Sequence, residues 1–96
     1  MPKGYLIARI DVTDPERYGR YAAVTPGVAA KYGGRFIVRA GRYEAKEGAA
    51  RARNAVIEFP DYESALAFYD DPEYRAALPH AVEGSEREVV IVEGAD

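Results

Sequence analysis

The sequence has 96 residues and a net charge of -3, with 48% apolar and 30% charged residues. This length suits one small domain spanning residues 1–96, and the composition is that of a globular chain. The absence of cysteine excludes disulfides and thiolate metal ligands. No apolar run approaches the roughly 20 residues of a membrane-spanning helix, and no signal peptide is recognisable. We therefore expect a cytoplasmic protein with no membrane partner.

The first elements in chain order are a strand and a helix. Residues 5–11 alternate in polarity between the two faces of a strand. Residues 13–16, Thr-Asp-Pro-Glu, combine a capping side chain with proline and glutamate, which together favour the start of a helix. The helix continues as a tyrosine-rich apolar stripe to Tyr32. Pro26 lies inside it and predicts a kink or break near residues 22–25, because proline removes a backbone hydrogen bond.

Two adjacent glycines mark the end of this helix. Gly33 and Gly34 can adopt the left-handed backbone that closes a helix. The residues after them alternate as a strand over 35–42. Charged and small side chains dominate residues 43–52, which predicts a hairpin connection, and a third strand returns at residues 53–59.

The last part of the chain predicts helical segments and a final strand. Asp61 can cap a helix that reaches Tyr69. A second short helical segment is predicted at residues 72–78, with Pro79 disturbing it, and the last strand lies at residues 88–93. The order β-α-β-β-α-β predicts an α+β, ferredoxin-like fold, in which a four-stranded antiparallel sheet has its helices on one face.

The alternation assigns side chains to two faces of this sheet. A purely apolar face should pack on the helices and contains Leu6, Ala8, Ile10, Phe36, Val38, Ala40, Ala55, Ile57 and Phe59. The opposite face contains Tyr5, Ile7, Arg9, Ile37, Arg39, Val56, Glu58, Val89 and Ile91. This second face is too apolar to remain in water on so small a protein. We therefore predict a homodimer in which two such faces cover each other.

Arg39 and Glu58 would be opposite or diagonal to each other on that second face. A covered arginine needs a partner, because an unpaired buried charge costs several kcal/mol. One interpretation is an ion pair within the interface. The other is a site for an anion or carboxylate, in which Arg39 or Arg53 donates hydrogen bonds.

The remaining candidates for chemistry are a histidine and the tyrosines. His80 is the only histidine, so with no cysteine the sequence predicts neither a zinc nor an iron site, and we expect no cofactor. His80 is a candidate for a general base, and a polar surface role is the alternative. Most of the eight tyrosines, including Tyr69, lie on predicted helices. They pack in the core or line a pocket for a small aromatic ligand.

The charges are distributed unevenly along the chain. Between Lys31 and Arg53 there are seven basic and two acidic residues, whereas residues 54–96 contain eleven acids and two arginines. A basic segment can bind nucleic acid. We expect instead that the basic and acidic surfaces meet within the fold or across a dimer. Net acidity would repel phosphate backbones, so no nucleic-acid partner is predicted.

Several motifs along the whole chain are similar to those of one family. They are Gly4-Tyr5, Thr13-Asp14-Pro15, Lys31-Tyr32-Gly33-Gly34-Arg35-Phe36, Val38-Arg39-Ala40-Gly41, Val56-Ile57-Glu58-Phe59-Pro60, Pro72-Glu73-Tyr74 and Val92-Glu93-Gly94. The chain resembles the small bacterial proteins of the domain of unknown function 1330 family, in the dimeric α/β-barrel superfamily. The resemblance implies a ferredoxin-like protomer whose sheet pairs face to face with a second copy. The superfamily includes cofactor-free monooxygenases, lactone isomerases, haem enzymes and stress-responsive proteins, so the fold does not select a function.

Two functions remain open at this point. The first is a cofactor-free enzyme or binder of a small organic ligand, held between sheet and helices. In it Arg39 and Arg53 would hold an anionic or carbonyl group, Glu58 would orient them, tyrosines such as Tyr69 would stack on the ligand, and His80 would carry protons. The second is a non-catalytic dimeric module without a ligand. A closed, partly polar cavity of about 300 Å³ or more favours the first, and a solid core favours the second.

Overall fold

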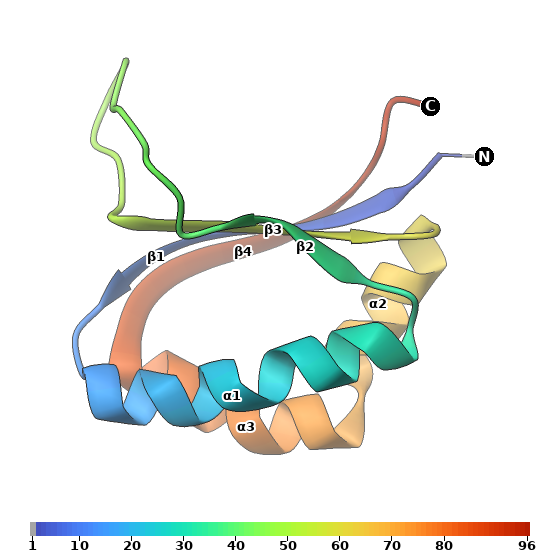
Figure 1. Ribbon diagram of the computed structural model, residues 1–96, viewed down its shortest axis with the longest axis horizontal. Coiled ribbons are helices and arrows are strands. Elements are labelled where there is room, and N and C mark those ends of the chain that lie inside the picture. The colour runs from blue at the N-terminus through green and yellow to red at the C-terminus, as the bar shows by residue number, and fades with distance from the viewer. Residues whose placement is uncertain (1) are drawn as a thin grey trace.

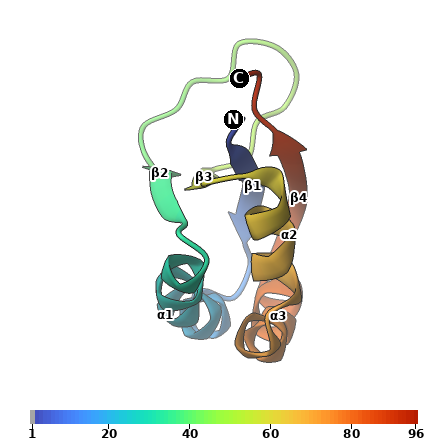
Figure 2. The ribbon, with the colours of Figure 1, turned by 90° about the vertical axis from the view of Figure 1, so that its right-hand side faces the viewer.

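A computed structural model describes residues 2–96 of the chain. The elements in chain order are β1 (Gly4–Val12), α1 (Pro15–Lys31), β2 (Arg35–Arg39), β3 (Arg53–Phe59), α2 (Tyr62–Asp70), α3 (Pro72–Gly84) and β4 (Ser85–Glu93). The strands form one antiparallel sheet in the order β2-β3-β1-β4. All three helices lie on the same face of this sheet, as Figures 1 and 2 show. The predicted ferredoxin-like architecture is thus confirmed.

An aspartate caps the start of each helix. A carboxylate oxygen of Asp14 accepts a hydrogen bond from the backbone N–H of Arg17 at 3.1 Å, and Asp61 accepts one from Ser64 at 2.8 Å. Asp71 accepts the backbone N–H groups of two residues in the first turn of α3. These bonds satisfy amides that have no partner inside the helix, which explains why the helices begin at these points in the sequence.

The two internal prolines do not end their helices. The break predicted at residues 22–25 is absent, because α1 continues through Pro26 to Lys31. The disturbance predicted at Pro79 is also wrong, since α3 continues through it to Gly84. A proline inside a helix costs about 3 kcal/mol. Burial offsets this cost: Val28, two residues after Pro26, and the residue that follows it are each 1% exposed.

The two adjacent glycines meet different requirements. Gly33 has φ = +75°, the left-handed backbone that was predicted for a helix end. At Gly34 the reason is space, because a Cβ there would lie 2.5 Å from Cε1 of Phe59. Closing α1 therefore needs one glycine for its backbone and a second for close packing on β3.

The pairing of β2 with β3 contains a β-bulge that the sequence did not reveal. Phe36 pairs with Ile57, but Val38 and not Ile37 pairs with Val56. One extra residue in a strand reverses the facing of every residue after it. Val38, predicted to be in the core, is 41% exposed on the face away from the helices. Arg39 pairs with Ala55 and so faces the helices, opposite to its predicted side.

The bulged strand is also shorter than predicted. It ends at Arg39, and Ala40, which was predicted for the core, is exposed with φ = +55°. The predicted facing of the β4 residues is also wrong. Val89 and Ile91 pair with inward-facing residues of β1 and pack against the core, whereas Val90 and Val92 are exposed.

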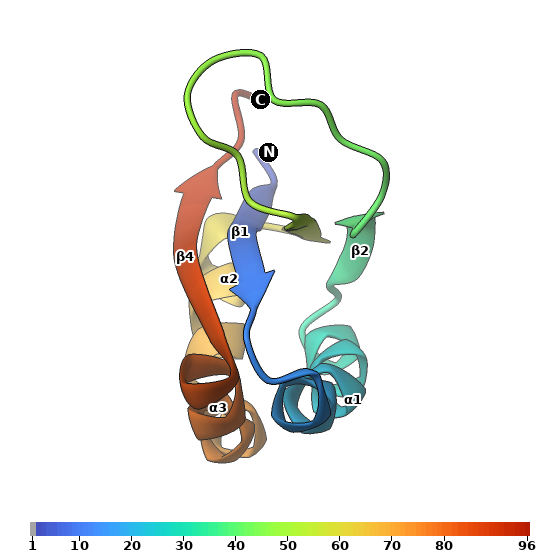
Figure 3. The same cartoon turned by 90° about the vertical axis from the view of Figure 1, so that its left-hand side faces the viewer.

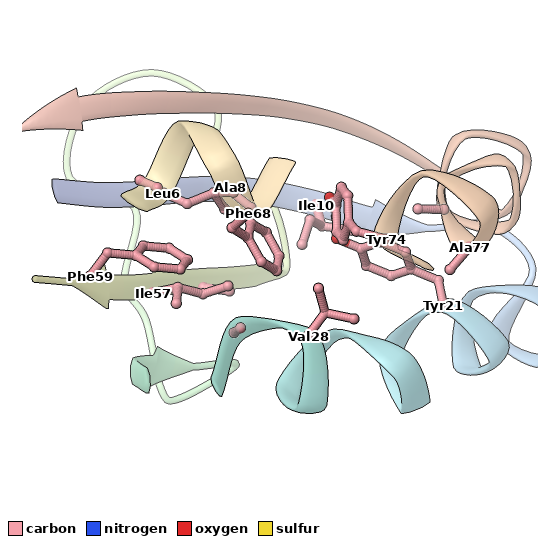
Figure 4. Close-up of a cluster of buried hydrophobic side chains, with 14 of the residues drawn as sticks. Leu6, Ala8, Ile10, Tyr21, Val28, Ile57, Phe59, Phe68, Tyr74 and Ala77 are labelled. Atoms are coloured by element: carbon pink, nitrogen blue, oxygen red, sulfur yellow. Dashed lines mark hydrogen bonds between the residues drawn. The ribbon is translucent and has the colours of Figure 1, made fainter. Parts of the chain in front are cut away.

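The core lies between the sheet and the helices and contains many aromatic rings (Figure 4). Phe68 packs against Phe59 and Tyr74, with ring centroids 5.3 and 4.5 Å apart. Tyr74 also contacts the Tyr21 ring, at a centroid distance of 5.7 Å. Such pairs stabilise a fold by burying large areas and by favourable ring geometry. The chain of rings joins β3, both C-terminal helices and α1.

The segment between β2 and β3 rises from the sheet on the side away from the helices (Figures 1 and 3). Its base is held by Arg51, whose guanidinium forms ion pairs with Asp11 at 2.8 Å and Glu88 at 2.6 Å. Arg9 donates to the carbonyl of Ala49 at 3.1 Å. The expectation that basic and acidic groups meet within the fold is confirmed at Arg51. None of the helices within residues 2–96 is both long and apolar enough to cross a membrane.

Candidate functional site

A small cavity lies between the inner face of the sheet and α1. Its volume is about 30 Å³, which is room for about one water molecule. The strands contribute apolar side chains to the lining, α1 contributes polar ones, and three arginines complete it. The lining residues are Leu6, Ala8, Ile10, Tyr18, Tyr21, Ala22, Thr25, Phe36, Arg39, Arg53, Ala55, Ile57 and Arg87.

Arg87 is at the centre of a buried polar network. Strand alternation places it on the inner face of β4, where it pairs with Ile10 of β1. Its Nη1 donates to the hydroxyl of Tyr21 at 3.1 Å, and its guanidinium carbon lies 4.8 Å from the centre of that ring. The Tyr21 hydroxyl is in turn 2.8 Å from the hydroxyl of Tyr74, and Figure 4 shows the two rings side by side. The network connects β4, α1 and α3.

The other two arginines lie over aromatic rings. The guanidinium carbon of Arg53 is 5.6 Å from the centre of the Tyr18 ring, and that of Arg39 is 4.7 Å from the centre of the Phe36 ring. Among residues 2–96, no carboxylate forms an ion pair with these two arginines or with Arg87. The cavity therefore combines three positive charges with no negative side chain.

Tyr18 and Tyr74 act as neutral groups at ordinary pH. Burial raises the pKa of Tyr18, and the neighbouring Tyr21 adds to this effect. Burial likewise raises the pKa of Tyr74, again with a contribution from Tyr21. Both phenols keep their protons well above pH 7, so they can donate hydrogen bonds but cannot supply a phenolate base.

A larger, open groove lies beside the cavity, along β4 and the C-terminal helices. Its volume is about 310 Å³, and we call it the β4 groove. Its lining residues are Tyr69, Leu78, Val82, Ser85, Arg87 and Val89. Arg87 lines both spaces, so its side chain stands between the cavity and the β4 groove.

The structure brings together some of the predicted site residues and separates others. Arg39 and Arg53 both line the cavity, whereas Tyr69 lines the β4 groove. Glu58 lies on the opposite face of the sheet, where it pairs with Arg35 at 3.2 Å. The predicted coupling of Arg39 to Glu58 is therefore wrong, and so is the role of Glu58 in orienting Arg39 and Arg53. The bulge in β2 is the physical reason for Arg39, and alternation along β3 places Arg53 and Glu58 on opposite faces.

His80 does not belong to the lining of the cavity. It lies on α3 and is partly exposed, and its Nδ1 is buried without a hydrogen-bond partner among residues 2–96. The cavity thus receives neither imidazole nor carboxylate from the described part of the chain. In the same residues, no group of three or more histidine, cysteine or acidic side chains could hold a metal ion.

Sequence reasoning missed Arg87 and the significance of Tyr21. The pattern around Arg87 in the sequence is ambiguous. A single glutamate separates Arg87 from a run of four apolar residues, Val89 to Val92. Such a run does not show which side chains face the helices. The choice depends on pairing with β1, and the partner of Arg87 on α1 is 66 residues away in sequence.

The antiparallel βαββαβ sheet, covered on one face, places the protein among ferredoxin-like α+β proteins. The chain belongs to the family described as Domain of unknown function (DUF1330), whose sequence model matches residues 3–95. The resemblance of the sequence motifs is thus confirmed. No curated protein matches the chain.

Solved structures share this fold at low sequence identity. A protein of unknown function from Rhodopseudomonas palustris is 14% identical with a TM-score of 0.77, covering 99% of this chain and 84% of that one. A dimeric ferredoxin-like protein of unknown function from Jannaschia sp. CCS1 is 16% identical with a TM-score of 0.75, covering 94% and 97%. SnoaB, a cofactor-independent oxygenase from Streptomyces nogalater, is 12% identical with a TM-score of 0.71, covering 100% and 96%. At these identities the likeness concerns the fold alone.

Proposed function

We propose that this protein is a cofactor-free enzyme or small-molecule binder whose ligand enters the cavity between the sheet and α1. The observation that carries this proposal is Arg87, a half-buried cation without a carboxylate partner in the described part of the chain. Structural arginines at such depth are normally paired, because burying an unpaired charge is costly. A cation that faces a cavity and is left unpaired is typical of a ligand site.

The size of the cavity requires movement on binding. About 30 Å³ is well below the roughly 300 Å³ of ordinary ligand sites. Arg39 is exposed, so its side chain can move into solvent, and Arg87 separates the cavity from the β4 groove of about 310 Å³. A ligand could extend from the groove into the cavity once Arg87 shifts. The small volume is also the observation that favours the second candidate, a dimeric module without a ligand.

We also propose that the protein is a homodimer formed through the face of the sheet that the helices leave open. Apolar residues there are exposed or half-buried, including Ile7, Val38, Val56, Val90 and Val92. A structurally similar protein from Thermobifida fusca, which is 19% identical with a TM-score of 0.59, is described as dimeric, as is the one from Jannaschia. Covering this face removes apolar area from water on both copies. The cytoplasmic location remains a prediction, to be checked by cell fractionation.

The ligand proposal can be tested by protein-observed NMR with a library of phenols, ketones and small organic acids. We expect at least one compound to shift the backbone amide resonances of Tyr21, Thr25 and Arg87. The variant Ala22→Leu adds volume at the cavity wall and should abolish this binding. Ala23→Leu is the matched control, because Ala23 is an exposed neighbour on α1. If no compound shifts these resonances at millimolar concentration, the ligand-free module is the correct reading.

A further inference from the structure

The hydrogen bonds around Tyr21 have a definite direction. Tyr74 is fully buried, and its hydroxyl lies 2.8 Å from the hydroxyl of Tyr21. If Tyr21 donated in this pair, the proton of Tyr74 would have no acceptor among residues 2–96 and no access to water. The stable arrangement is therefore donation from Tyr74 to Tyr21, since a buried donor needs an acceptor.

This direction leaves the proton of Tyr21 free for a ligand. Its oxygen already accepts from Tyr74 and from Nη1 of Arg87, which can only donate. Two accepted bonds use both lone pairs of the phenol oxygen, so the remaining O–H has no partner within the network. Tyr21 lines the cavity, and an acceptor placed there would receive this hydrogen bond.

The neighbouring acids cannot neutralise Arg87. Glu86 and Glu88 flank it in β4, but alternation along a strand points them to the opposite face. Glu88 is bound there by Arg51 at 2.6 Å. A negative charge for Arg87 must therefore come from outside the described chain. Thr25 does not supply one, and its hydroxyl proton is used by the carbonyl of Tyr21 at 3.0 Å.

We propose, on the basis of the function proposed above, that the ligand is a small monocarboxylate with an apolar body. Its carboxylate would lie between the Arg87 guanidinium and the Tyr21 hydroxyl. A guanidinium presents parallel N–H groups that match the two oxygens of a carboxylate. Arg53, which also lines the cavity without a carboxylate partner, adds positive potential. Apolar side chains such as Leu6, Ala55 and Ile57 form the rest of the wall and suit an aromatic or branched body.

Sodium benzoate and benzamide provide the test, because they have the same shape and differ in charge. We expect benzoate to bind the wild-type protein at least about 10-fold more tightly than benzamide in NMR titrations, since only the anion can form a bidentate ion pair with the Arg87 guanidinium. Sodium phosphate, which lacks an apolar body, should bind more weakly than benzoate.

Two variants locate the carboxylate. Arg87→Met should weaken benzoate binding by about 10-fold or more, and Tyr21→Phe by a smaller factor, because Tyr21→Phe keeps the ring and removes only the O–H. Neither variant should affect benzamide to the same extent. Arg20→Met is the control, since Arg20 is exposed on α1 and pairs with Glu16 at 3.6 Å. If Arg87→Met does not fold, Tyr21→Phe alone decides the location.

The outcomes separate this inference from the proposed function. Equal affinity for benzoate and benzamide, with shifted amide resonances at the cavity, would support a ligand site. It would contradict the inference that the ligand is a carboxylate. Tighter binding of phosphate would also overturn it, as would benzoate binding that both variants leave unchanged. No benzoate binding at 10 mM would refute the monocarboxylate, and the wider compound library would then decide whether the cavity binds anything.

Discussion

Arg35 and Glu58 face each other across β2 and β3 on the side of the sheet away from the helices, with Nη2 and Oε1 3.2 Å apart. The hydroxyl of Tyr5 donates to the other carboxylate oxygen of Glu58, also at 3.2 Å. Arg35 is largely exposed and Glu58 is mostly covered, with side chains 74% and 17% exposed. Glu58 thus pairs with Arg35, which precedes the bulge. Arg39 follows the bulge and therefore faces the cavity.

A double-mutant cycle can test this assignment. Combining Arg35→Met with Glu58→Gln should give a coupling energy of about 0.2–1 kcal/mol, the range for exposed ion pairs. The same cycle with Arg39→Met should give a coupling within error of zero, because the sheet separates Arg39 from Glu58. Urea unfolding of the single and double variants provides the free energies. A larger coupling for Arg39 than for Arg35 would contradict the bulged register.

The hydroxyl pair in the core makes a second prediction. Tyr74→Phe should lower the free energy of unfolding by about 1–2 kcal/mol, because it removes a buried hydrogen bond to Tyr21. Tyr43→Phe is a suitable control, since Tyr43 is exposed in the segment between β2 and β3, and its effect should be close to zero. Equal effects of the two substitutions in chemical denaturation would show that the pair does not stabilise the fold.

The proposed dimer makes a third prediction. Val90 and Val82 are similarly exposed, at 54% and 62%, but Val90 faces away from the helices and Val82 lies on α3. Val90→Glu should convert a dimer into a monomer, because it places a charge in an apolar interface. Val82→Glu should leave the dimer intact. Light scattering at tens of micromolar protein would check both variants. A wild-type monomer at that concentration would contradict the proposed homodimer.

Asp71 provides a pH-dependent prediction. The hydroxyl of Tyr32 and the ammonium of Lys31 hold the pKa of this carboxyl at about 2, below its ordinary value of 3.8. A lowered folded-state pKa means that the charged form stabilises the fold above about pH 4. This stabilisation disappears as the pH falls from about 4 towards 2.

The variant Asp71→Asn isolates this charge, because asparagine can still cap α3. It should lower the melting temperature at pH 7, and the difference from the wild-type protein should shrink between pH 4 and pH 2. Asp70→Asn is the neighbouring control, since the Asp70 side chain is 80% exposed. Calorimetric scans across this pH range would measure the effect. A constant difference at every pH would mean that the charge of Asp71 does not contribute.

The basic segment makes the last prediction. Arg51 is engaged by Asp11 and Glu88, and Lys46 pairs with Glu44 at 2.7 Å. We therefore expect no nucleic-acid binding stronger than about 10 μM at physiological salt, which is a non-specific level. Fluorescence anisotropy with labelled duplex and single strands is the measurement. Sub-micromolar, salt-sensitive binding that is lost in Lys46→Glu would contradict this expectation.

Local signals in the sequence were sufficient for most of the fold. Aspartate caps marked the helix starts, and the third strand was predicted with its observed bounds, residues 53–59. These features depend on neighbouring residues alone. The bulge after Phe36 could not be predicted in this way, because Ile37 and Val38 are both apolar and alternation does not identify an extra residue. The predicted facing of the β4 residues was wrong for the same reason, so the inward position of Arg87 was not recognised.

The bulge has an evolutionary consequence. If β2 kept its length but paired without the bulge, Ile37 would lie opposite Val56, and Arg39 would turn from the cavity to the opposite face of the sheet. Such a one-residue shift in pairing would thus subtract a positive charge from the candidate binding site and add one to the proposed dimer contact. Homologues that pair this strand without the bulge should therefore diverge in ligand preference and in self-association at the same time.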